Sequence, residues 1–590
     1  MKHLLQRSLP PAPGFAEPEL YARTTGEVRF GVDATGASRA SMGAGATLAF
    51  DTSFGVMHAG RWRRLTAIDE IEARVVAEGS GRAEVFAVTR GRETVVSSVA
   101  LGAQPVDVRV GSLRQSNWGV LFVRVVADSP TTVHRVEWRT SSAPRRDVRL
   151  SLSITTFNRH AYVVPTVKKV LALVRSHDAL RGRVRVLVVD NADNVKFDEA
   201  QGEDLTVVAN PNLGGAGGFA RGLMWLRAQG WATHVLFMDD DITLESESLV
   251  RTVSLFSHAV DEKLCVHGAM LSEERQWMQF EAGSKYLWRS LYPLRALGQE
   301  DDLRERRLAL RDDKERRFAY SAWWYTAFPI GITRDNPLPI FVRGDDVAFG
   351  LMHTGQHTVT MQGICVWHAD FALKNNPSSL YYEVRNFALI DTLVFDDHKA
   401  RHLAWRYLGF GFRNAYSHRY ASAEYMIWGM RDFLAGPDEW MRIDHAAKHD
   451  QVRQVSEEKA APLAPELLAL GFTPPRPKFI RLGGYLMAPF LGAGQFLPKP
   501  MRSSAVGVAQ IDVRAVGLAI RHKSILYRHP RFDEGFVCER DYRRFARIQR
   551  EVFSTALQLM RSYRRLKKAY RAAYPEMVST ESWKKRCGIN

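Results

Sequence analysis

Residues 233–241 read THVLFMDDD, an apolar run that ends in three consecutive aspartates, Asp239, Asp240 and Asp241. A short, continuous apolar run is typical of a strand buried on both faces of a sheet. Three adjacent carboxylates repel one another and lose hydration where such a strand ends. A divalent cation removes both costs, so the stretch predicts a metal site at the carboxyl end of a strand.

The alternation of side chains in an extended chain divides the three carboxylates. Asp239 and Asp241 point to one side of the strand, and Asp240 points to the other. We therefore assign a cation, Mn2+ or Mg2+, and the phosphates it would carry to Asp239 and Asp241, and ribose contacts or the local network to Asp240. The alternative is an acidic loop or a helix cap beginning at Asp241, and the triplet alone does not decide between the two.

The chain around this stretch predicts an α/β layer. Strands and helices are expected to follow one another over 148–157, 161–177, 183–191, 205–210, 212–230 and 233–241. Such a succession is typical of a largely parallel sheet, and ligands bind these sheets at the carboxyl ends of the strands. The three aspartates lie at such an end, which supports a binding site there.

Three regions of different composition predict three domains. Residues 1–147 contain short β-rich runs separated by turns, with a spacing of about ten residues that is typical of a β-sandwich or barrel. Residues 148–398 hold the α/β pattern, and residues 399–590 are rich in Trp, Tyr and Arg and predict a helical domain. Within the last region, 541–571 contain ten Lys and Arg against two acids, on the predicted outer face of an amphipathic helix.

The 590-residue chain carries a net charge of +17, from 81 Lys and Arg against 64 Asp and Glu. Such an excess favours anionic partners, namely a nucleotide, a phospholipid surface or nucleic acid, and a merely solvated basic surface is the alternative. Nucleic acid is disfavoured, because the basic residues cluster in one helix and no recognition motif is present. The four cysteines form no CxxC pair and no run of about 18 apolar residues occurs, so we expect a cytoplasmic protein without a zinc site, disulfides or a spanning helix.

A second acidic pair, Asp345 and Asp346, follows an aromatic stretch that includes Trp323 and Trp324. A carboxylate pair near an aromatic platform fits general-base chemistry on a sugar hydroxyl, and partial burial would raise its pKa into the useful range. The alternative is a helix N-terminus, where acids interact favourably with the helix dipole. The two tryptophans are equally expected to stack on an acceptor sugar or to lie in the core.

His368 lies 22 residues beyond Asp346, in the stretch VWHADF. An imidazole added to Asp239 and Asp241 suits Mn2+ slightly better than Mg2+, although a single histidine is more often structural. The Gly-rich stretch 209–222 would bring backbone N–H groups and a helix N-terminus to a nucleotide phosphate. It also contains a loose G-x-G-x-x-A dinucleotide pattern, which is weakened by its place after the third strand rather than the first.

Taken together, the motifs occur in a specific order along the chain: SITTFNR, VVDN, NPNLGGAGGFARG, FMDDDI, WWY, GDD, WH and YYEVRN. This order resembles the family 2 glycosyltransferases of GT-A fold, and more closely the bacterial galactofuranosyltransferases that polymerise galactan from UDP-galactofuranose. The resemblance covers residues 148–390. The lengths of the β-rich N-terminal region and of the helical C-terminal region are also similar to those of the polymerising members, which implies a GT-A catalytic domain between the two.

By position, the resemblance implies a role for each motif. Asp239, Asp241 and His368 match the metal-binding residues of the family. Asp346 matches its catalytic base. Uridine, ribose and diphosphate would be held by Phe157, Arg159, Asp190, Asn191, Asn212, Gly214, Asp240 and Arg385. The acceptor would be held by Trp323, Trp324, Asp345 and Glu281.

Two positions depart from the family pattern. Gly344 stands where a bulkier, often aromatic, residue precedes the acidic pair. The segment 279–284, QFEAGS, matches the acceptor loop that bears Glu281 only loosely. Both departures bear on the acceptor, its linkage and the product length, and neither bears on the donor.

The resemblance therefore implies an inverting, Mn2+- or Mg2+-dependent enzyme that transfers galactofuranose from UDP-galactofuranose to a glycan or polyprenyl-linked glycan in cell-surface polysaccharide synthesis. The basic helix would lie on the anionic inner surface of the cell membrane, and a homo-oligomer is a further expected assembly. Two other classes stay open at this point: a dinucleotide-dependent oxidoreductase built on the Gly-rich turn, and a non-catalytic carbohydrate-binding protein.

Overall fold

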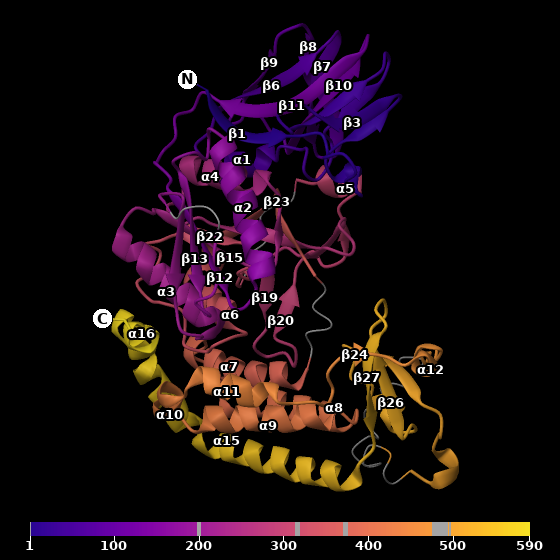
Figure 1. Ribbon diagram of the computed structural model, residues 1–590, viewed down its shortest axis with the longest axis vertical. Coiled ribbons are helices and arrows are strands. Elements are labelled where there is room, and N and C mark those ends of the chain that lie inside the picture. Colours follow the sequence, from indigo (N-terminus) through magenta and orange to yellow (C-terminus); the bar gives the residue numbers. More distant parts are fainter. Residues whose placement is uncertain are drawn as a thin grey trace.

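The structure is a computed structural model that describes residues 2–197, 202–312, 319–369, 376–474, 494 and 497–589. Figure 1 shows three regions stacked along the longest axis, with strands of the N-terminal region at the top, a mixed α/β region in the middle and helices at the bottom. This arrangement confirms the predicted α/β fold class with its β-rich and helical flanks.

The N-terminal region contains two antiparallel sheets, as predicted for a sandwich. One sheet consists of β1 (His3–Ser8), β3 (Val28–Val32), β4 (Ser38–Met42), β6 (Glu70–Glu78), β9 (Val106–Ser112) and β11 (Thr131–Thr140). The other consists of β2 (Arg23–Thr25), β5 (Thr47–Ala49), β7 (Gly81–Thr89), β8 (Arg92–Ala100) and β10 (Val120–Ala127). One short helix, α1 (Ala59–Leu65), follows β5.

The α/β region is built on a ten-stranded mixed sheet. Its strands are β12 (Leu150–Thr156), β13 (Val184–Asp190), β14 (Leu205–Ala209), β15 (His234–Asp239), β16 (Thr243–Leu244), β17 (Cys265–Ser272), β18 (Met278–Glu281), β21 (Asp301–Asp302), β22 (Thr326–Pro329) and β23 (Thr358–His368). Strands β14, β13, β12 and β15 are parallel neighbours in that order, and β22 joins β15 antiparallel. The prediction of a parallel sheet is therefore right for the half that carries the three aspartates.

The carboxyl ends of the parallel strands meet at one edge of the sheet. Thr155 of β12 is paired with Asp239 of β15. Thr156 is paired with Asp190, the last residue of β13. The acidic triplet is therefore level with the ends of the neighbouring strands, where parallel sheets bind ligands.

Helices α2 (His160–Ser176), α3 (Gly214–Gln229) and α4 (Glu247–His258) belong to the same region. The Gly-rich start of α3 has a steric reason. Gly214 has a φ of 69°, and a Cβ there would lie 2.3 Å from the carbonyl oxygen of Phe341. The N–H of Ala216 donates to that same oxygen at 3.1 Å. The glycine thus lets the start of α3 close against the segment that precedes the second acidic pair.

The β-sandwich and the α/β region share one buried core. A single apolar cluster includes Val75 of β6, Val123 of β10 and Leu236 of β15. The buried Arg251 of α4 also crosses between them, because its guanidinium donates to the carbonyl of Phe54 at 2.6 Å. The N-terminal region is therefore packed directly on the region of the ten-stranded sheet.

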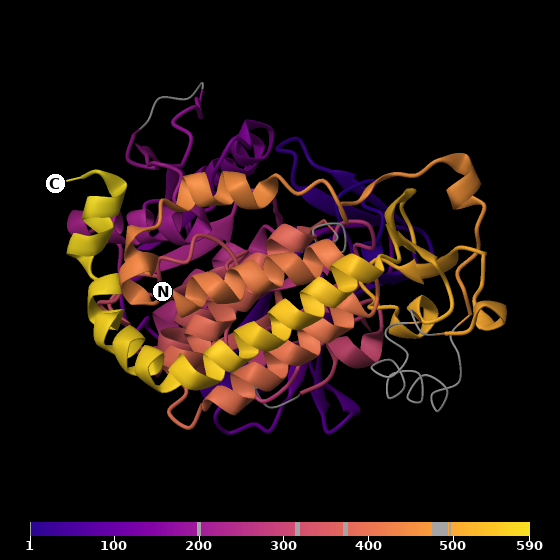
Figure 2. The same cartoon turned by 90° about the horizontal axis from the view of Figure 1, so that it is seen from below.

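The main helices of the C-terminal region are α7 (Pro377–Val394), α8 (Ala400–Ala415), α9 (Tyr420–Leu434) and α15 (Tyr542–Met577). Figure 2 shows α15 running across the layer of the other three. The domain boundary at 398 stays a prediction, because α7 before it packs against α9 after it. Within the described ranges, the chain contains no helix with the length and hydropathy needed to cross a membrane.

The smaller helices complete the chain. Two of them, α5 (Arg306–Ala309) and α6 (Asp345–Phe349), belong to the α/β region. The C-terminal region also holds α10 (Pro437–Arg442), α11 (His445–Arg453), α12 (Pro465–Leu468), α14 (Val516–Ala519) and α16 (Thr580–Cys587).

The C-terminal region is mostly helical, as predicted, but it also contains strands that the sequence did not indicate. A four-stranded sheet lies within it, made of β24 (Ala461–Pro462), β25 (Gly507–Gln510), β26 (Ser524–Arg528) and β27 (Glu534–Glu539). These strands have six residues or fewer, too short for a clear alternation of apolar and polar residues.

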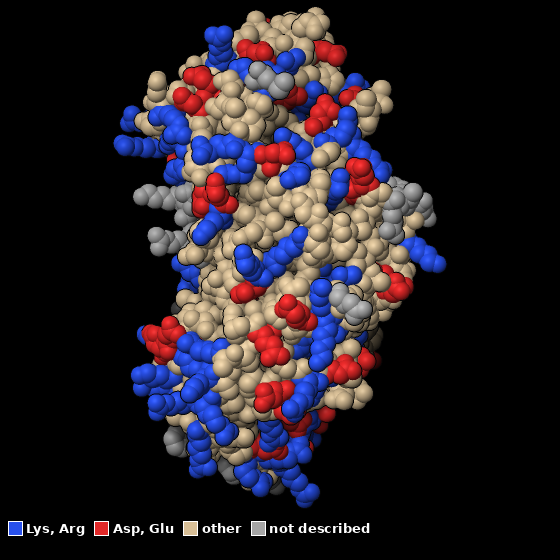
Figure 3. Space-filling model, turned by 90° about the vertical axis from the view of Figure 1, so that its left-hand side faces the viewer, with Lys and Arg blue, Asp and Glu red and all other residues tan. Residues whose placement is uncertain are grey.

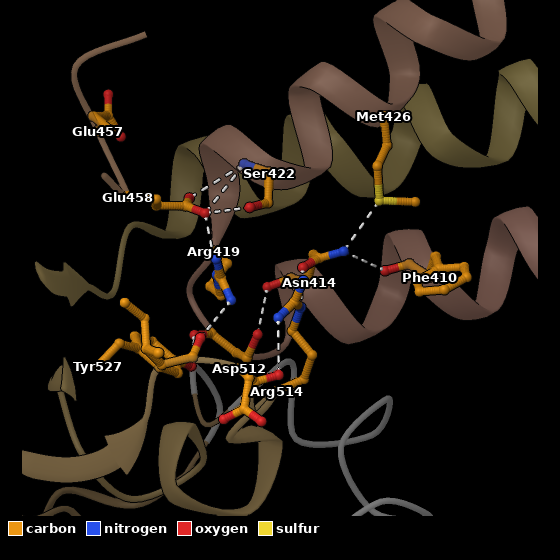
Figure 4. Close-up of polar contacts among 12 residues, drawn as sticks. Phe410, Asn414, Arg419, Ser422, Met426, Glu457, Glu458, Asp512, Arg514 and Tyr527 are labelled. Atoms are coloured by element: carbon orange, nitrogen blue, oxygen red, sulfur yellow. Dashed lines mark hydrogen bonds and ion pairs between the residues drawn. The ribbon is translucent and has the colours of Figure 1, made fainter. Parts of the chain in front are cut away.

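A buried polar network joins this sheet to the helices (Figure 4). Arg419, fully buried before α9, places Nε 3.3 Å from Glu458 Oε2, and the N–H of Ser422 donates to the same carboxylate at 3.3 Å. Nearby, Arg514 Nε donates to Asn414 Oδ1 at 2.6 Å. Because buried ion pairs are costly to break, these contacts hold the sheet firmly on the turn between α8 and α9.

Candidate active site

The acidic triplet forms a bonded network at the end of β15. Asp240 is buried, and its Oδ2 accepts the hydroxyl proton of Thr156 at 2.6 Å. Burial raises the pKa of Asp240 to about 6. Asp240 therefore belongs to the local network, which is one of the two roles that the strand alternation left for it.

Two predicted metal ligands from distant parts of the chain lie together. His368, buried at the end of β23, places Nε2 3.4 Å from Asp241 Oδ1. Arg159 Nη1 donates to the other oxygen of Asp241 and lies 3.4 Å from Asp240 Oδ1. Arg159 is therefore the counter-ion of the triplet, although the sequence pattern assigned it to the donor.

The donor set fits a divalent cation in its chemistry. Carboxylate oxygens with one imidazole nitrogen suit Mn2+ and are acceptable for Mg2+. Across the described residues, however, no three metal-binding side chains converge on one point. Asp239 and Asp241 instead line two different cavities. Asp241 and His368 can therefore supply two neighbouring ligands to a cation. The third ligand stays a prediction.

Removal of the Arg159 guanidinium is expected to tighten Mn2+ binding. In Arg159→Gln, a divalent ion no longer has to displace a bound cation from Asp241. Titration followed by electron paramagnetic resonance, without any UDP-sugar, should show affinity about threefold or more above that of the native protein. Arg175→Gln, an exposed arginine near the other end of α2, is the matched control. Unchanged or weaker binding in Arg159→Gln would show that the guanidinium does not compete with the cation.

The predicted acceptor-side residues converge on one cavity of about 640 Å³. Its walls include the side chains Asp239, Glu281, Trp323, Trp324, Asp345 and Asp346. They come from the end of β15, the end of β18, the segment before β22 and the start of α6. The structure thus brings together every residue that the sequence assigned to the acceptor and to the catalytic base.

Asp345 and Asp346 form the first turn of α6, so the helix N-terminus interpretation and the cavity interpretation both hold. Burial raises the pKa of Asp346 to about 6. Burial, with the charge of Asp346 as the second cause, raises the pKa of Asp345 well above its usual range. The N–H of Val347 donates to Asp346 Oδ1 at 2.7 Å, which fixes that carboxylate and leaves Oδ2 for a proton.

Glu281 supplies a further carboxyl group to the same cavity. It is buried, and burial raises its pKa to about 7, with the charge of Asp346 adding to the effect. Neighbouring carboxyls with raised pKa values can share their protons, so that one is a donor while another is ionised. This pairing suits a site that holds one hydroxyl and deprotonates another.

The two tryptophans have a double role. Trp323 is buried and packs edge-on against Phe219 and Phe237, with ring centroids 4.9 and 5.0 Å apart. Trp324 Nε1 donates to the carbonyl of Gly268 at 2.9 Å. Both are therefore core residues that also line the 640 Å³ cavity, and their stacking on an acceptor sugar stays a prediction.

The glycine that departs from the family pattern is explained by its neighbours. Gly344 has a φ of 95°, a left-handed conformation that favours glycine. A Cβ there would lie 3.2 Å from Phe387 and 3.1 Å from Ile390, both on α7. An aromatic ring from α7 thus fills the space beside the acidic pair in place of a side chain at 344.

The prediction that Arg385 reaches the diphosphate is wrong. Arg385 is fully buried on α7, and its Nη2 donates to the carbonyl of Ile340 at 2.9 Å. Its Nη1 donates to the Tyr381 hydroxyl at 3.3 Å, and the guanidinium stacks on the Trp440 ring at 4.4 Å. The side chain ties α7 to the segment before the acidic pair and has no exposed surface for a ligand.

Asp190 and Asn191 are also buried. The Asp190 carboxylate accepts three backbone N–H bonds of 2.6 to 2.9 Å from the loop 192–195. Asn191 Nδ2 donates to the carbonyl of Gly214 at 3.0 Å. These contacts shape the loop and the start of α3, so the structure does not support the prediction that the two side chains themselves hold uridine.

The remaining donor candidates border the same edge of the sheet. Phe157, directly after β12, is 39% exposed. Asn212 is half-buried, and its Oδ1 accepts the N–H of Gly214 at 3.2 Å. Both positions are compatible with a nucleotide over the carboxyl ends of β12 and β14.

A second large cavity, of about 680 Å³, was not predicted from the sequence. It is lined by residues of α2, β16 and the triplet, among them Tyr162, Lys169, Asp240, Asp241 and Glu273. Tyr162 lies beside Arg159, with 5.9 Å between the guanidinium carbon and the ring centroid. The acidic triplet therefore separates two cavities, and only an exposed aromatic in the first turn of α2 hinted at the second.

Two parts of the chain match known protein families. Residues 151–301 match the family described as glycosyl transferase family 2. Residues 5–141 match the family described as galactofuranosyltransferase 2 N-terminal. The predicted resemblance and the GT-A type of fold class are thereby confirmed, and the two matches meet close to the predicted boundary between the β-rich and α/β regions.

Two curated relatives are similar to most of the chain. Galactofuranosyltransferase GlfT2 of Mycolicibacterium smegmatis is 24% identical over 595 residues, covering 91% of this chain and 88% of the relative. Galactofuranosyltransferase GlfT2 of Mycobacterium tuberculosis is 27% identical over 473 residues, covering 74% and 72%. Among solved structures, GalNAc-T7 with UDP, GalNAc and Mn2+ aligns over 49% of this chain and 53% of its own, with 13% identity and a TM-score of 0.31, which is too low to support an inference.

Proposed function

We propose that this chain, a glycosyltransferase with a family 2 domain, transfers galactofuranose from UDP-galactofuranose to a hydroxyl of a glycan or lipid-linked glycan acceptor in cell-surface polysaccharide synthesis. The observation that carries the proposal is the single cavity shared by Asp239, Asp346 and the two tryptophans. A base, an aromatic wall and the first residue of the acidic triplet there face one space. Such an arrangement suits sugar transfer between a nucleotide donor and a second sugar.

The transfer would invert the anomeric centre. Asp346 Oδ2 takes the proton of the acceptor hydroxyl while that oxygen forms a bond to the anomeric carbon. The bond from this carbon to the diphosphate oxygen breaks on the opposite face, and UDP leaves with the electron pair. Protonated Glu281 would hold the acceptor by donating a hydrogen bond, since its pKa is raised to about 7.

Asp239, Asp241 and His368 would hold the metal, Mn2+ or Mg2+, which supplies positive charge to the diphosphate when it is bound. Arg159 would then be released from Asp241 and would be free to pair with a donor phosphate, because guanidinium groups bind carboxylate and phosphate equally well. Phe157, Asn212 and Gly214 would border the nucleotide.

The dinucleotide alternative is disfavoured by the start of α3. The glycine that would have to approach a pyrophosphate, Gly214, already lies against the carbonyl of Phe341. The next position, Gly215, lies against the Asp345 carboxylate, 3.2 Å from where its Cβ would be. The Phe341 carbonyl and the Asp345 side chain thus occupy the Cβ side of these two glycines, which a pyrophosphate of a dinucleotide would have to approach.

The donor can be tested directly. The purified protein would be incubated with a panel of UDP-sugars and a glycan acceptor in the presence of Mn2+, and UDP release would be measured. Release should be fastest with UDP-galactofuranose and should depend on the acceptor. Faster turnover with a pyranose donor would contradict the proposed donor, and tight NAD binding without UDP binding would select the oxidoreductase alternative.

The outer face of α15 supports the proposed membrane partner. Its inner face is buried through Ile548, Val552 and Leu559, as the sequence periodicity predicts. The outer face carries exposed apolar residues at helical spacing, Phe553, Leu557 and Met560, flanked by the exposed basic residues Arg543, Arg547, Arg550, Arg561, Arg564, Arg565 and Lys568. Figure 3 shows Lys and Arg crowded on the lower, helical part of the molecule. Apolar residues within a basic surface are typical of helices that lie in an anionic membrane interface.

Replacement of this apolar stripe is expected to weaken membrane binding. The triple variant Phe553→Ser, Leu557→Ser, Met560→Ser should bind vesicles that contain anionic phospholipid about tenfold or more weakly than the native protein in co-sedimentation. Val537→Ser, which removes an exposed apolar residue of β27, is the control. Equal binding of the triple variant, or binding that does not fall with salt, would contradict a membrane role for this face.

A further inference from the structure

The turn directly before the acidic pair, residues 340–344, has an unusual backbone. Phe341, Arg343 and Gly344 have φ angles of 73°, 63° and 95°, all in the left-handed region. Residues other than glycine rarely take this conformation, and it persists only where surrounding contacts hold it. Because two of the three residues are not glycine, the turn is a strained segment next to Asp345 and Asp346.

The first half of the strained turn is a γ-turn. The N–H of Val342 donates to the carbonyl of Ile340 at 3.0 Å, across the positive φ of Phe341. A γ-turn with a positive φ at its central residue is the rare form that carries strain. Ile340 and Phe341 are also buried, so their polar backbone groups need partners from the protein rather than from water.

Asn386, a fully buried residue of α7, supplies partners to this turn. Its Nδ2 donates to the carbonyl of Arg343 at 2.7 Å and to that of Val342 at 2.8 Å. The same nitrogen lies 3.3 Å from the carbonyl oxygen of Ile340. One side-chain amide thus contacts three carbonyls of the strained turn.

The orientation of this amide is fixed by the residue before it. Arg385 Nε donates to Asn386 Oδ1 at 3.0 Å. A guanidinium can only donate hydrogen bonds, so the amide oxygen faces Arg385 and the amide NH2 faces the turn. Arg385 Nη2 also donates to the carbonyl of Ile340 at 2.9 Å. The last two residues of the motif YYEVRN therefore act together on the strained turn.

Donors from other elements take the carbonyls that come earlier in this segment. The indole N–H of Trp440 donates to the carbonyl of Pro339 at 3.0 Å, and the N–H of Ala216 donates to that of Phe341 at 3.1 Å. Of the carbonyls described, those of Val342 and Arg343 are the nearest in sequence to the acidic pair. Asn386 thus holds the part of the turn that leads directly into α6.

We propose that Asn386 is a positioning residue for sugar transfer, because its amide holds the strained turn in the shape that places the Asp346 carboxylate in the 640 Å³ cavity. The inference rests on the proposed function, in which Asp346 is the base. Asn386 is fully buried, so it acts through the turn and not on the substrate itself. A shift of about 1 Å in a reacting group can lower a rate about a hundredfold, so loss of these bonds would affect transfer even where the fold survives.

The test compares Asn386→Asp and Asn386→Ala with the native full-length protein. Aspartate keeps the shape and can pair with Arg385, but it turns a carboxylate oxygen towards the carbonyls of the turn. Alanine removes the amide altogether. In each variant the single-turnover rate of UDP release should fall about thirtyfold or more, while the Kd of UDP-galactofuranose stays within about twofold of the native value. A native rate in both variants would overturn the inference.

Asn414→Ala is the matched control for stability. Asn414 is an equally buried asparagine on α8, and its Nδ2 donates to the carbonyl of Phe410 at 3.0 Å. Its replacement should lower the temperature of unfolding about as much as Asn386→Ala does, and should leave the transfer rate within about twofold. An equally large loss of rate in Asn414→Ala would assign the effect to general stability and would overturn the inference.

A double-variant cycle shows which residue Asn386 acts through. In the Asp346→Asn background the base is already absent, so Asn386→Ala should reduce the rate by less than about twofold further. A further loss as large as that in the native background would overturn the inference, because Asn386 would then act by another route. No transfer by the native protein from UDP-galactofuranose to any acceptor would instead overturn the proposed function.

Discussion

Asp346→Asn is expected to reduce kcat for sugar transfer by about a thousandfold, because the amide cannot accept the proton of the acceptor hydroxyl. The substitution keeps the shape of the side chain and the bond from the Val347 N–H to the Oδ1 position. Binding of UDP-galactofuranose should therefore stay within about twofold of the native value in calorimetric titration. UDP release under single-turnover conditions measures the chemical step directly.

The matched comparison is Asp345→Asn, on the same turn of α6 and the same cavity wall. Burial, with the charge of Asp346 as the second cause, raises the pKa of this carboxyl group well above its usual range, and the Val347 N–H fixes Asp346 rather than Asp345. We expect a smaller loss of kcat in this variant. A large loss in Asp345→Asn together with substantial turnover in Asp346→Asn would assign the base to Asp345 instead.

The pH dependence of the transfer rate is a second test of Asp346 as the base. Burial raises the pKa of Asp346 to about 6, so the carboxyl is protonated and inactive below that pH and ionised above it. The rate of transfer should therefore rise with pH through about 6 and level off above it. A rate that is flat between pH 5 and pH 8 would contradict a base with this raised pKa.

Removal of divalent metal is expected to stop transfer, and this is the second large effect. EDTA should reduce UDP release to background, because the leaving diphosphate then has no cation to neutralise its charge. Addition of Mn2+ or Mg2+ should restore UDP release. In Asp241→Asn and in His368→Ala, Mn2+ binding followed by electron paramagnetic resonance should weaken about tenfold or more. Asp178→Asn, an exposed acid just beyond the C-terminal end of α2, is the control.

Full activity in EDTA, with no detectable Mn2+ binding to the native protein, would contradict the metal assignment. In that case Arg159 would be the permanent counter-ion of the triplet, since its guanidinium already bonds to Asp241 in the structure. Weak Mn2+ binding that appears only with UDP present would still support the assignment, because Mg2+ and Mn2+ commonly bind through substrate phosphates.

The site that the sequence could predict is the part set by strand ends. The apolar run before Asp239 indicates a strand, and parallel strands place their carboxyl ends at one edge of the sheet. That Asp239, Asp190 and Thr155 lie at the same edge therefore follows from local sequence patterns. The order of the motifs then added His368 and Asp346 from far along the chain. In the structure His368 lies beside Asp241 and Asp346 lines the cavity with Asp239, while their roles as metal ligand and base stay predictions.

The errors share one physical cause, which is burial that depends on distant packing. Arg385 reads as a phosphate ligand in sequence, but its surroundings are set by Trp440 on another helix. Asp190 and Asn191 read as ribose contacts, but Asp190 accepts hydrogen bonds from the loop that follows it and Asn191 donates to Gly214 at the start of α3. The spacing of apolar residues does not reveal these long-range contacts. It shows which face of a helix or strand is apolar, but not which other element packs on that face.

The division of the triplet between two cavities is a further feature that side-chain alternation alone did not predict. Alternation places Asp239 and Asp241 on one side. In the structure β15 ends at Asp239, so the chain beyond it is no longer extended and Asp241 turns towards the second cavity. The pairing of Arg159 with Asp241 stabilises this arrangement.

The most direct test is the structure of the first transfer product. Purified protein, UDP-galactofuranose, Mn2+ and a short alkyl glycoside acceptor would be combined, and the anomeric configuration of the new linkage would be determined by NMR before any second transfer. We predict one added galactofuranose with its configuration inverted relative to the donor. A retained configuration, or free galactofuranose in place of a new linkage, would contradict single displacement with Asp346 as the base.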